Sequence, residues 1–292
     1  MRRFVSIVKA TALEVISEPL SLLLFSASLS LAVFAPAFHY HQFGEATRMA
    51  RDAGLSALLL GGMVFSVAGA VRSVRREIES GTAALALTHP VSRLQFLLAK
   101  SCGVFVAFLL FALTLGAVTV TIVNGARIGA EVAQRTGDIP RLWGPSYAFG
   151  VAAVVLPYVL GAALDRIWRV RFALSAFLTA AATALVSVGY RPDVATALRL
   201  LPAVVLLALP AAFFVMVSCA AAVRLRANLA GAAVALATAA FLPFAGNYCL
   251  SEAWSDGGVI PGVYVLVAAL AALPAVLAAV LAGALFIGRQ DL

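Results

Sequence analysis

Charged residues are scarce in this chain: Asp, Glu, Lys and Arg together make up 12% of its 292 residues. Soluble domains carry about twice that share and are about half apolar. Here 63% of the residues are hydrophobic and the mean hydropathy is +1.03. The composition therefore excludes an ordinary soluble domain and predicts a membrane protein.

Residues that build reactive sites are also few. Cys102, Cys219 and Cys249 are far apart and form no Cys-x-x-Cys pair, so we expect them to pack as small apolar side chains. The sequence contains neither a P-loop nor a Gly-x-Gly-x-x-Gly motif, which excludes the usual nucleotide cradles. His39 and His41 could hold a soft metal, but two polar residues at a helix exit are the simpler interpretation. We predict no catalytic residue, no metal site and no bound cofactor.

The hydrophobic residues are grouped in runs long enough to cross a bilayer, which takes about 20 residues of helix. Eight runs qualify, and they predict an all-α polytopic transmembrane bundle in which residues 1–292 form a single domain. The runs lie at about 19–38, 53–71, 100–123, 146–164, 172–189, 200–223, 228–246 and 260–287. If the loop at Arg224–Asn228 does not face the cytoplasm, the last third would contain re-entrant segments and six spans would remain.

No run holds Lys, Arg, Asp or Glu well inside its limits. Ion-coupled carriers, channels and intramembrane hydrolases need ionisable groups at that depth, so the sequence argues against all three classes. Small residues are present instead, since Gly54, Gly61, Gly62 and Gly69 recur through the second run. Small side chains let helices approach closely in lipid, and we expect tight packing there.

Basic residues indicate the orientation, because Lys and Arg are enriched in cytoplasmic loops. With the N-terminus inside, 14 of the 21 Lys and Arg residues, both lysines among them, lie on the cytoplasmic side. This bias predicts cytoplasmic N- and C-termini in the inner membrane. It also explains the net charge of +8 without a nucleic-acid partner. Segments 124–145 and 247–259 become outer loops.

Residues 1–18 are predicted to form an amphipathic helix that lies in the headgroup plane. Its apolar face repeats with a helical period and consists of Phe4, Val5, Val8, Ala12, Val15 and Ile16. Pro19 suits the first turn of a new helix, so the chain should bend just before it and enter the bilayer. A fraying tail is the alternative.

One compact, charged and turn-rich segment, residues 72–99, separates the second and third runs. The second helix should continue into it, and Gly81 offers a left-handed helix end. Thr82 can cap a short helix that stops before Pro90, and Ser92 begins an S-x-x-Q capping box for the next helix. The segment therefore predicts a short helix held between two corners.

This short helix would expose Leu85 and Leu87 at the cytoplasmic surface unless a partner covers them. A helical hairpin folded against the protein's own surface is the alternative. Because the spans lack charge, any driving force has to reach the bundle from outside it. The apolar turn flanked by charge predicts a docking site for such a partner.

The sequence E-x-E-x-G-T-x-x-x-x-L-x-x-P-V-S-R, followed by a lysine, resembles the cytoplasmic motif of ABC-2-type transporter permeases. The matching residues are Glu77, Glu79, Gly81, Thr82, Leu87, Pro90, Val91, Ser92, Arg93 and Lys100. The sequence departs from the family at Ala99, where glycine is frequent, and the usual span count is six. In size and layout the chain is most similar to the permeases of the nitrous-oxide-reductase and copper-maturation type.

The resemblance implies the membrane subunit of an ATP-driven exporter, with a coupling helix between spans two and three. That helix would sit in a groove of a separate cytoplasmic ABC ATPase subunit, with charged residues setting the register. The implied coupling residues are Glu77, Glu79, Gly81, Thr82, Leu85, Leu87, Pro90, Ser92, Arg93 and Lys100.

The resemblance further implies that ATP and Mg²⁺ bind to the ATPase subunit, so this chain is no enzyme. Two permease chains, as a homodimer or heterodimer, would enclose the pathway in the lipid bilayer. The alternative is a non-transporting membrane scaffold that anchors an ATPase or a signalling partner through the same loop.

Overall fold

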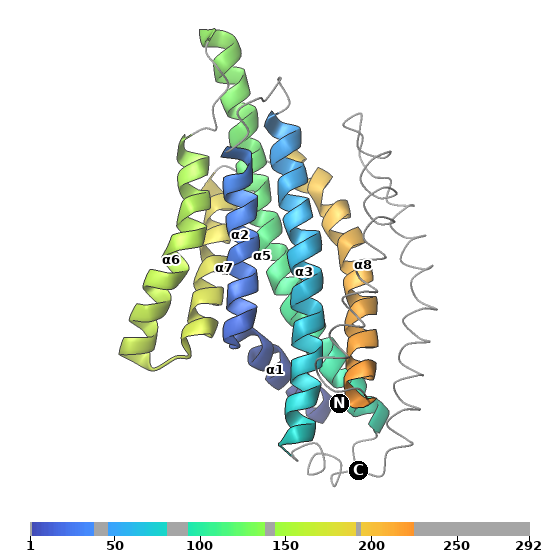
Figure 1. Cartoon of the computed structure of the whole chain (residues 1–292). Coiled ribbons are helices and arrows are strands. Elements are labelled where there is room, and N and C mark those ends of the chain that lie inside the picture. Colours follow the sequence, from blue (N-terminus) through green and yellow to red (C-terminus); the bar gives the residue numbers. More distant parts are fainter. Residues whose placement is uncertain (1, 38–45, 81–92, 138–143, 191–193, 225–292) are drawn as a thin grey trace. The chain divides into compact units, whose positions relative to one another are not determined.

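The computed structural model describes residues 2–37, 46–80, 93–137, 144–190 and 194–224, and these ranges contain helices and short turns but no strand (Figure 1). The α helices are α1 (Arg2–Ile16), α2 (Pro19–Phe34), α3 (Ala46–Glu79), α5 (Arg93–Thr136), α6 (Gly144–Trp168), α7 (Phe172–Tyr190) and α8 (Val194–Arg224). A 3₁₀ turn, η1 (Ala35–Ala37), follows α2. The prediction of an all-α fold is confirmed for the described part of the chain.

Five helices, α3, α5, α6, α7 and α8, are each long and apolar enough to cross a membrane. Helices α1 and α2 meet that criterion only together, as a pair bent by 65°, so the described ranges hold five candidate spans or up to six. The first six predicted runs correspond to α2, α3, α5, α6, α7 and α8. The runs at 228–246 and 260–287 and the outer loop at 247–259 lie outside the described residues. The total of eight spans therefore stays a prediction.

The predicted break before Pro19 is confirmed. Helix α1 ends at Ile16, Glu18 has extended backbone angles, and Pro19 opens α2. Proline fits this position because the first helical residues have no intrahelical partner for an N–H. The N–H of Leu22 donates to the carbonyl oxygen of Glu18 at 3.2 Å and closes the first turn. The location of α1 in the headgroup plane stays a prediction.

Helices α3 and α5 are longer than the apolar runs that predicted them. Helix α3 continues to Glu79, as expected for the charged stretch after the second run. Helix α5 has 44 residues, so its length is about 66 Å, roughly twice the hydrocarbon thickness of a bilayer. Part of α5 must therefore lie outside the hydrocarbon core.

The predicted outer loop at 124–145 is helical as far as Thr136, and this corrects the sequence-based boundary. Arg127 and Glu131 form an i, i+4 ion pair at 3.7 Å, which favours helix in this polar stretch. The helix ends at Gly137, whose φ of 74° is left-handed and whose N–H donates to the carbonyl oxygen of Ala133 at 2.9 Å. A glycine C-cap thus ends the helix about four turns beyond the apolar run.

The described residues pack as two units. The first contains residues 2–15, 63–80, 93–109 and 205–224, and the second contains residues 16–37, 46–62, 110–137, 144–190 and 194–204. Each of the helices α3, α5 and α8 is divided between the two units.

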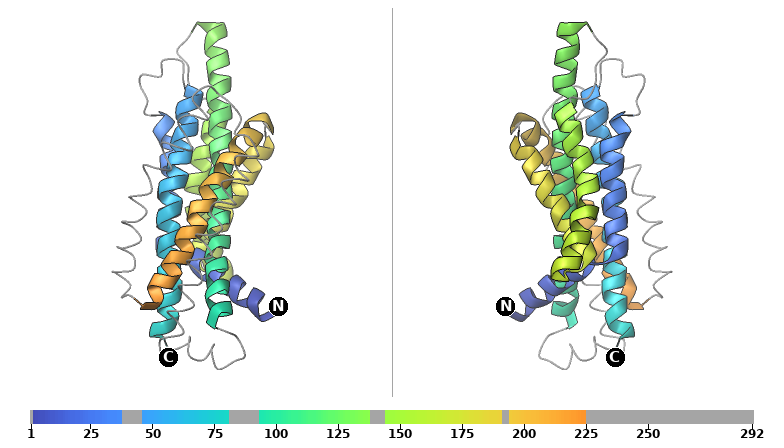
Figure 2. Two further views of the ribbon diagram at one scale, coloured as in Figure 1. Left: turned by 90° about the vertical axis from the view of Figure 1, so that its right-hand side faces the viewer. Right: turned by 90° about the vertical axis from the view of Figure 1, so that its left-hand side faces the viewer.

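An aromatic cluster forms the centre of the second unit. Phe25 stacks on Phe177 with ring centroids 4.0 Å apart and meets Phe111 edge-on at 5.5 Å. All three side chains are buried, so the cluster joins α2, α5 and α7. Helices α6 and α7 lie side by side in the same unit (Figures 1 and 2), where the hydroxyl of Ser175 donates to the carbonyl oxygen of Gly161 at 3.2 Å.

Glycines make the close approaches that the sequence predicts. A Cβ atom at Gly54 would overlap the side chain of Thr119, and one at Gly61 would overlap the hydroxyl of Ser28. Both contacts bring helices together at distances that only a missing side chain permits. The expected tight packing of the second run is confirmed at these positions.

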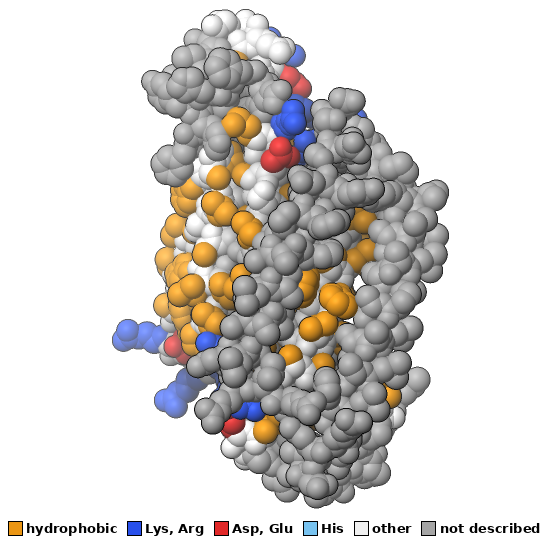
Figure 3. Space-filling model, turned by 45° about the vertical axis from the view of Figure 1, so that its right-hand side comes forward, with side chains coloured by type: hydrophobic (Ala, Val, Ile, Leu, Met, Phe, Trp, Pro, Cys, Tyr) orange, Lys and Arg blue, Asp and Glu red, His pale blue; other side chains and the backbone are white. Residues whose placement is uncertain are grey.

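The surface is apolar along the helices and charged at their ends. On the face shown in Figure 3, hydrophobic side chains cover the middle of the described helices, and Lys, Arg, Asp and Glu gather near the termini. Val155 and Val159 on α6 are half or more exposed, although they are large and apolar. Such exposure is unfavourable in water and expected in lipid.

Candidate functional site

The residues predicted to couple the chain to a partner lie on and between the ends of α3 and α5. Six of them, Gly81, Thr82, Leu85, Leu87, Pro90 and Ser92, lie outside the described residues. The other four are described: Glu77 and Glu79 lie in the last turn of α3, Arg93 begins α5, and Lys100 lies about two turns further along α5. The predicted short helix at 83–88 belongs to the part that is not described.

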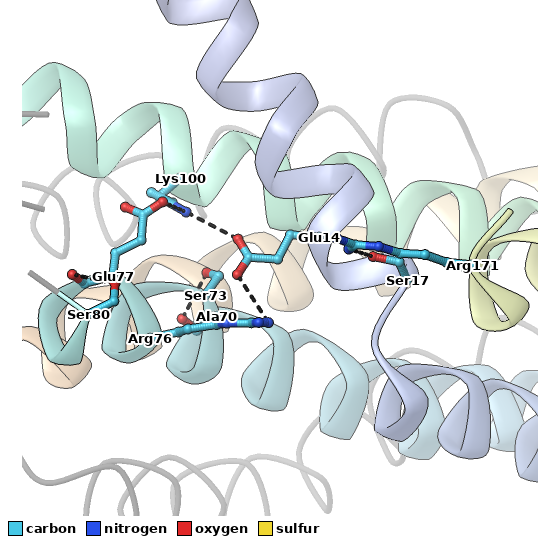
Figure 4. A network of polar contacts seen from close by, with 9 residues as sticks. All are labelled: Glu14, Ser17, Ala70, Ser73, Arg76, Glu77, Ser80, Lys100 and Arg171. Atoms are coloured by element: carbon cyan, nitrogen blue, oxygen red, sulfur yellow. Dashed lines mark hydrogen bonds and ion pairs between the residues drawn. The ribbon is translucent and has the colours of Figure 1, made fainter. Parts of the chain in front are cut away.

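Lys100 is the centre of a buried ionic cluster in the first unit (Figure 4). Its Nζ lies 2.6 Å from Oε1 of Glu77 and 3.5 Å from Oε2 of Glu14. The Lys100 side chain is 2% exposed, whereas Glu14 and Glu77 are 28% and 26% exposed. One buried ammonium group therefore joins α1, α3 and α5.

A fourth group balances the charge of this cluster. Nη1 of Arg76 lies 3.8 Å from Oε1 of Glu14, and the Arg76 side chain is mostly exposed. Two cations and two carboxylates make the cluster neutral overall. Neutrality matters here, because a buried ammonium without a partner would cost several kcal/mol of solvation free energy.

Small residues bring α1 close enough for Glu14 to reach Lys100. A Cβ atom at Gly103 would lie 2.6 Å from Cβ of Thr11 and 2.8 Å from the carbonyl oxygen of Val8. On the α3 side, a Cβ atom at Gly69 would lie 3.0 Å from a methyl group of Val15. Both glycines therefore let the backbone of α1 lie against α3 and α5, and this placement brings Glu14 within reach of Lys100.

Helix α8 contacts the same region beside Lys100. Cys219 is fully buried beside Ser101 and Lys100. Cys102 is partly buried, and both thiols are free. The expectation that cysteines act as packing residues is confirmed for Cys219, and Cys249 lies outside the described residues.

Glu79, another charged residue of the predicted set, is more exposed than Glu77. Oε1 of Glu79 lies 3.5 Å from Nη2 of Arg75 within α3, and the Glu79 side chain is 65% exposed. Glu79 is thus more accessible than Glu77, which faces Lys100. Their contacts with a partner, like those of Arg93, stay predictions.

Sequence reasoning missed Glu14, which it placed on the polar side of a surface helix. The only signal was that Lys100 is one of two lysines in the chain and begins an apolar run. A lysine in that position needs a carboxylate, but Glu14 is 86 positions away along the sequence. Helical periodicity relates neighbours within a helix and could not identify this partner.

In the described ranges, no group of three or more His, Cys, Asp and Glu residues has a geometry that could hold a metal ion. His39 and His41, the alternative metal ligands suggested by the sequence, lie outside those ranges. The cluster around Lys100 consists of two cations and two carboxylates that are held in ion pairs.

Residues 11–183 match a family described as ABC-2 family transporter protein. The matched range covers more than half of the 292 residues and includes Glu14, Glu77, Lys100 and the intervening loop. The chain belongs to the ABC-2 transporter family. This ABC-2 permease is a multi-pass membrane transport protein, and its family consists of membrane subunits without an ATPase site of their own. No curated protein and no solved structure matches the chain.

Proposed function

We propose that this ABC-2 permease is the transmembrane subunit of an ATP-driven exporter and that residues 81–92 dock on a separate cytoplasmic ABC ATPase. In this proposal the permease forms the pathway and the ATPase binds ATP and Mg²⁺. Family membership supports a transport role, and the loop motif supports the place of docking. The buried cluster around Lys100 is the observation that carries the proposal.

The cluster supports coupling because it ties together both ends of the docking segment. Glu77 lies four residues before Gly81, and Lys100 lies at the same level on α5, after the segment. A force on the loop would move the ends of α3 and α5 together, since the ion pair between them is short and its Lys100 side chain is buried. Glu14 extends the same connection to α1.

The proposed assembly contains two permease chains, as a homodimer or heterodimer, and two ATPase chains. Cytoplasmic termini in the inner membrane follow from the distribution of basic residues. The further similarity to permeases of the nitrous-oxide-reductase and copper-maturation type rests on size and layout, and we include it in the proposal as a subfamily hypothesis.

The docking assignment is tested by co-purification with the Walker-motif ATPase encoded nearest to the permease gene. Leu85→Asp or Leu87→Asp places a charge where the proposal expects an apolar contact. We expect each substitution to abolish co-purification while the permease still inserts in the membrane. Val132→Asp, at an exposed apolar position in the polar end of α5, serves as the matched control and should leave the complex intact.

Survival of the complex in both loop variants would show that the docking assignment is wrong. Loss of the complex in the Val132→Asp control as well would also contradict the assignment, because the effect of an added charge would then be general. Membrane insertion is measured in parallel by fractionation, so a folding defect is recognised.

A second variant distinguishes the transporter from the alternative function, a scaffold that anchors the ATPase without transport. Lys100→Met removes the ionic connection and leaves Leu85 and Leu87 unchanged, so the complex should still form. If the chain transmits force, permease-stimulated ATP hydrolysis should fall several-fold in this variant. Unchanged stimulation would favour the scaffold, because a passive anchor needs only the docking contact.

A further inference from the structure

A groove in the second unit lies outside the cluster around Lys100. It has a volume of about 490 Å³ and is formed by the start of α2, the middle of α6 and the start of α7. Leu22, Leu23 and Phe172 supply apolar walls, and Tyr158 lies opposite Phe172 with ring centroids 6.3 Å apart. The volume is in the range of sites that hold small organic ligands, and the walls fit a hydrocarbon chain.

A guanidinium group stands at the same groove. Nη1 of Arg171 donates a hydrogen bond to the hydroxyl of Ser17 at 3.1 Å, which fixes the arginine beside the start of α2 (Figure 4). Arg171 is exposed and lines the groove, and no Asp or Glu is among the lining residues. Glu18, next to Ser17, is not a lining residue. The polar part of the groove is therefore cationic.

The surrounding turn adds to this positive charge. The last turn of α6 and the segment that joins α6 to α7 carry Arg166, Arg169 and Arg171 against a single carboxylate, Asp165. Arg169 has a φ of 51°, so α6 ends there, and Arg166 and Arg169 are exposed. Three arginines within six positions give the turn an excess of two positive charges.

The groove lies beside the ends of candidate spans, where lipid headgroups are expected. It is next to the start of α2 and to the turn between two candidate spans, α6 and α7. Trp168, the last residue of α6, is 73% exposed, and exposed tryptophan is typical of the membrane–water interface. Basic pockets between transmembrane helices at this depth suit anionic headgroups.

We propose that this groove binds one anionic phospholipid from the leaflet that contains the α6–α7 turn. The phosphate accepts hydrogen bonds from Arg171, and one acyl chain lies along Leu23 and Phe172. A free phosphate ion would use the arginine but leave the apolar walls exposed, so the combination favours a lipid. The site is independent of the docking loop and of the proposed ATPase partner.

The test compares lipid retention by the full-length permease in native mass spectrometry. The purified chain is released from micelles that contain equal amounts of phosphatidylglycerol and phosphatidylcholine with the same acyl chains. We expect about tenfold preferential retention of phosphatidylglycerol, which corresponds to about 1.4 kcal/mol. Arg171→Gln should remove the preference, whereas Arg171→Lys should keep part of it because the positive charge remains.

Two further measurements distinguish the acyl chain from the anion. Ser26→Phe fills the groove at a half-buried lining position, so it should lower the retention of both lipids. Added inorganic phosphate should not displace phosphatidylglycerol. Arg135→Gln, a change of equal charge at the exposed end of α5, should behave as the unmodified chain.

Equal retention of the two lipids by the unmodified chain would overturn the proposal. Equal behaviour of Arg171→Gln and Arg135→Gln would do the same, since the effect would then be one of net charge. Displacement of phosphatidylglycerol by inorganic phosphate would also overturn the proposal, because the groove would then bind a simple anion rather than a lipid. The apparent melting temperature of each variant is measured in parallel to detect variants that do not fold. If a variant does not fold, the lipid preference of the unmodified chain alone tests the proposal.

Discussion

Replacing Glu77 by glutamine is predicted to harm the protein more than removing the lysine that Glu77 pairs with. Glu77→Gln keeps the size of the side chain but deletes the nearer negative charge, at 2.6 Å from Nζ of Lys100. Lys100 then stays buried with Glu14 alone, at 3.5 Å. Lys100→Met deletes the buried charge itself and fills the same space with a flexible apolar chain.

The distances give the order of magnitude of each effect. With an effective dielectric constant of about 20, the Coulomb attraction is roughly 6 kcal/mol for the Glu77 pair and roughly 5 kcal/mol for the Glu14 pair, before the opposing desolvation. Removing one partner of a buried pair destabilises proteins by about 3 to 5 kcal/mol, and Glu14 remains, so we expect about 3 kcal/mol for Glu77→Gln. Lys100→Met leaves two carboxylates that are more than a quarter exposed and can hydrate, so about 1 kcal/mol is expected.

Thermal unfolding of the full-length permease in one detergent, at one scan rate, measures the difference. A loss of 1 kcal/mol lowers the melting temperature by about 2 to 4 °C in chains of this size class. Glu77→Gln should therefore lower the apparent melting temperature by about 6 °C or more, and Lys100→Met by about 4 °C or less. The double variant should fall no further than Lys100→Met, because the glutamine then has no unpaired lysine beside it.

Lys9→Met is the matched control, since Lys9 is the other lysine, is exposed on α1, and should leave the melting temperature unchanged. The reasoning is refuted if Lys100→Met destabilises the permease as much as Glu77→Gln. Additive losses in the double variant would refute it as well, because Glu77 and Lys100 would then contribute independently.

Two predictions concern packing. Gly103→Val should separate α1 from α5, since a Cβ atom at Gly103 would lie 2.6 Å from Cβ of Thr11, and crosslinking between α1 and α5 should fall several-fold. Gly189→Val, with open space around it, should leave this crosslinking unchanged. Equal crosslinking in both variants would contradict the contact. Phe25→Ala removes the ring between two other aromatic rings and should cost about 3 kcal/mol, measured as a lower melting temperature, whereas Phe4→Ala at an exposed position should be neutral. A similar melting temperature for these two phenylalanine variants would show that the cluster is not central to the unit.

Several features follow from the sequence because they depend on neighbouring residues. The low charge and the long apolar runs indicate that these segments are surrounded by lipid, and they therefore predict a membrane protein. The break before Pro19 and the extension of α3 to Glu79 follow from backbone chemistry within one or two turns. The loop motif is also a local pattern, and it led to the family that the match over residues 11–183 shows.

The third apolar run, at about 100–123, placed the end of helix α5 too early. The apolar run ends near residue 123, but α5 continues to Thr136 because helix formation does not require a hydrophobic face along its whole length. The signal that ends the helix is Gly137, whose left-handed conformation is a backbone property rather than a change in polarity.

Only the tertiary structure decided the partners of Lys100 and the groove at Arg171. Glu14 and Lys100 are 86 positions apart, and Ser17 and Arg171 are 154 positions apart, so neither pairing has a periodic signature. Both depend on how closely helices pack, which is governed by glycines and side-chain shape rather than by mean hydropathy. Sequence patterns therefore determined where helices form and what surrounds them, and packing determined which charges meet.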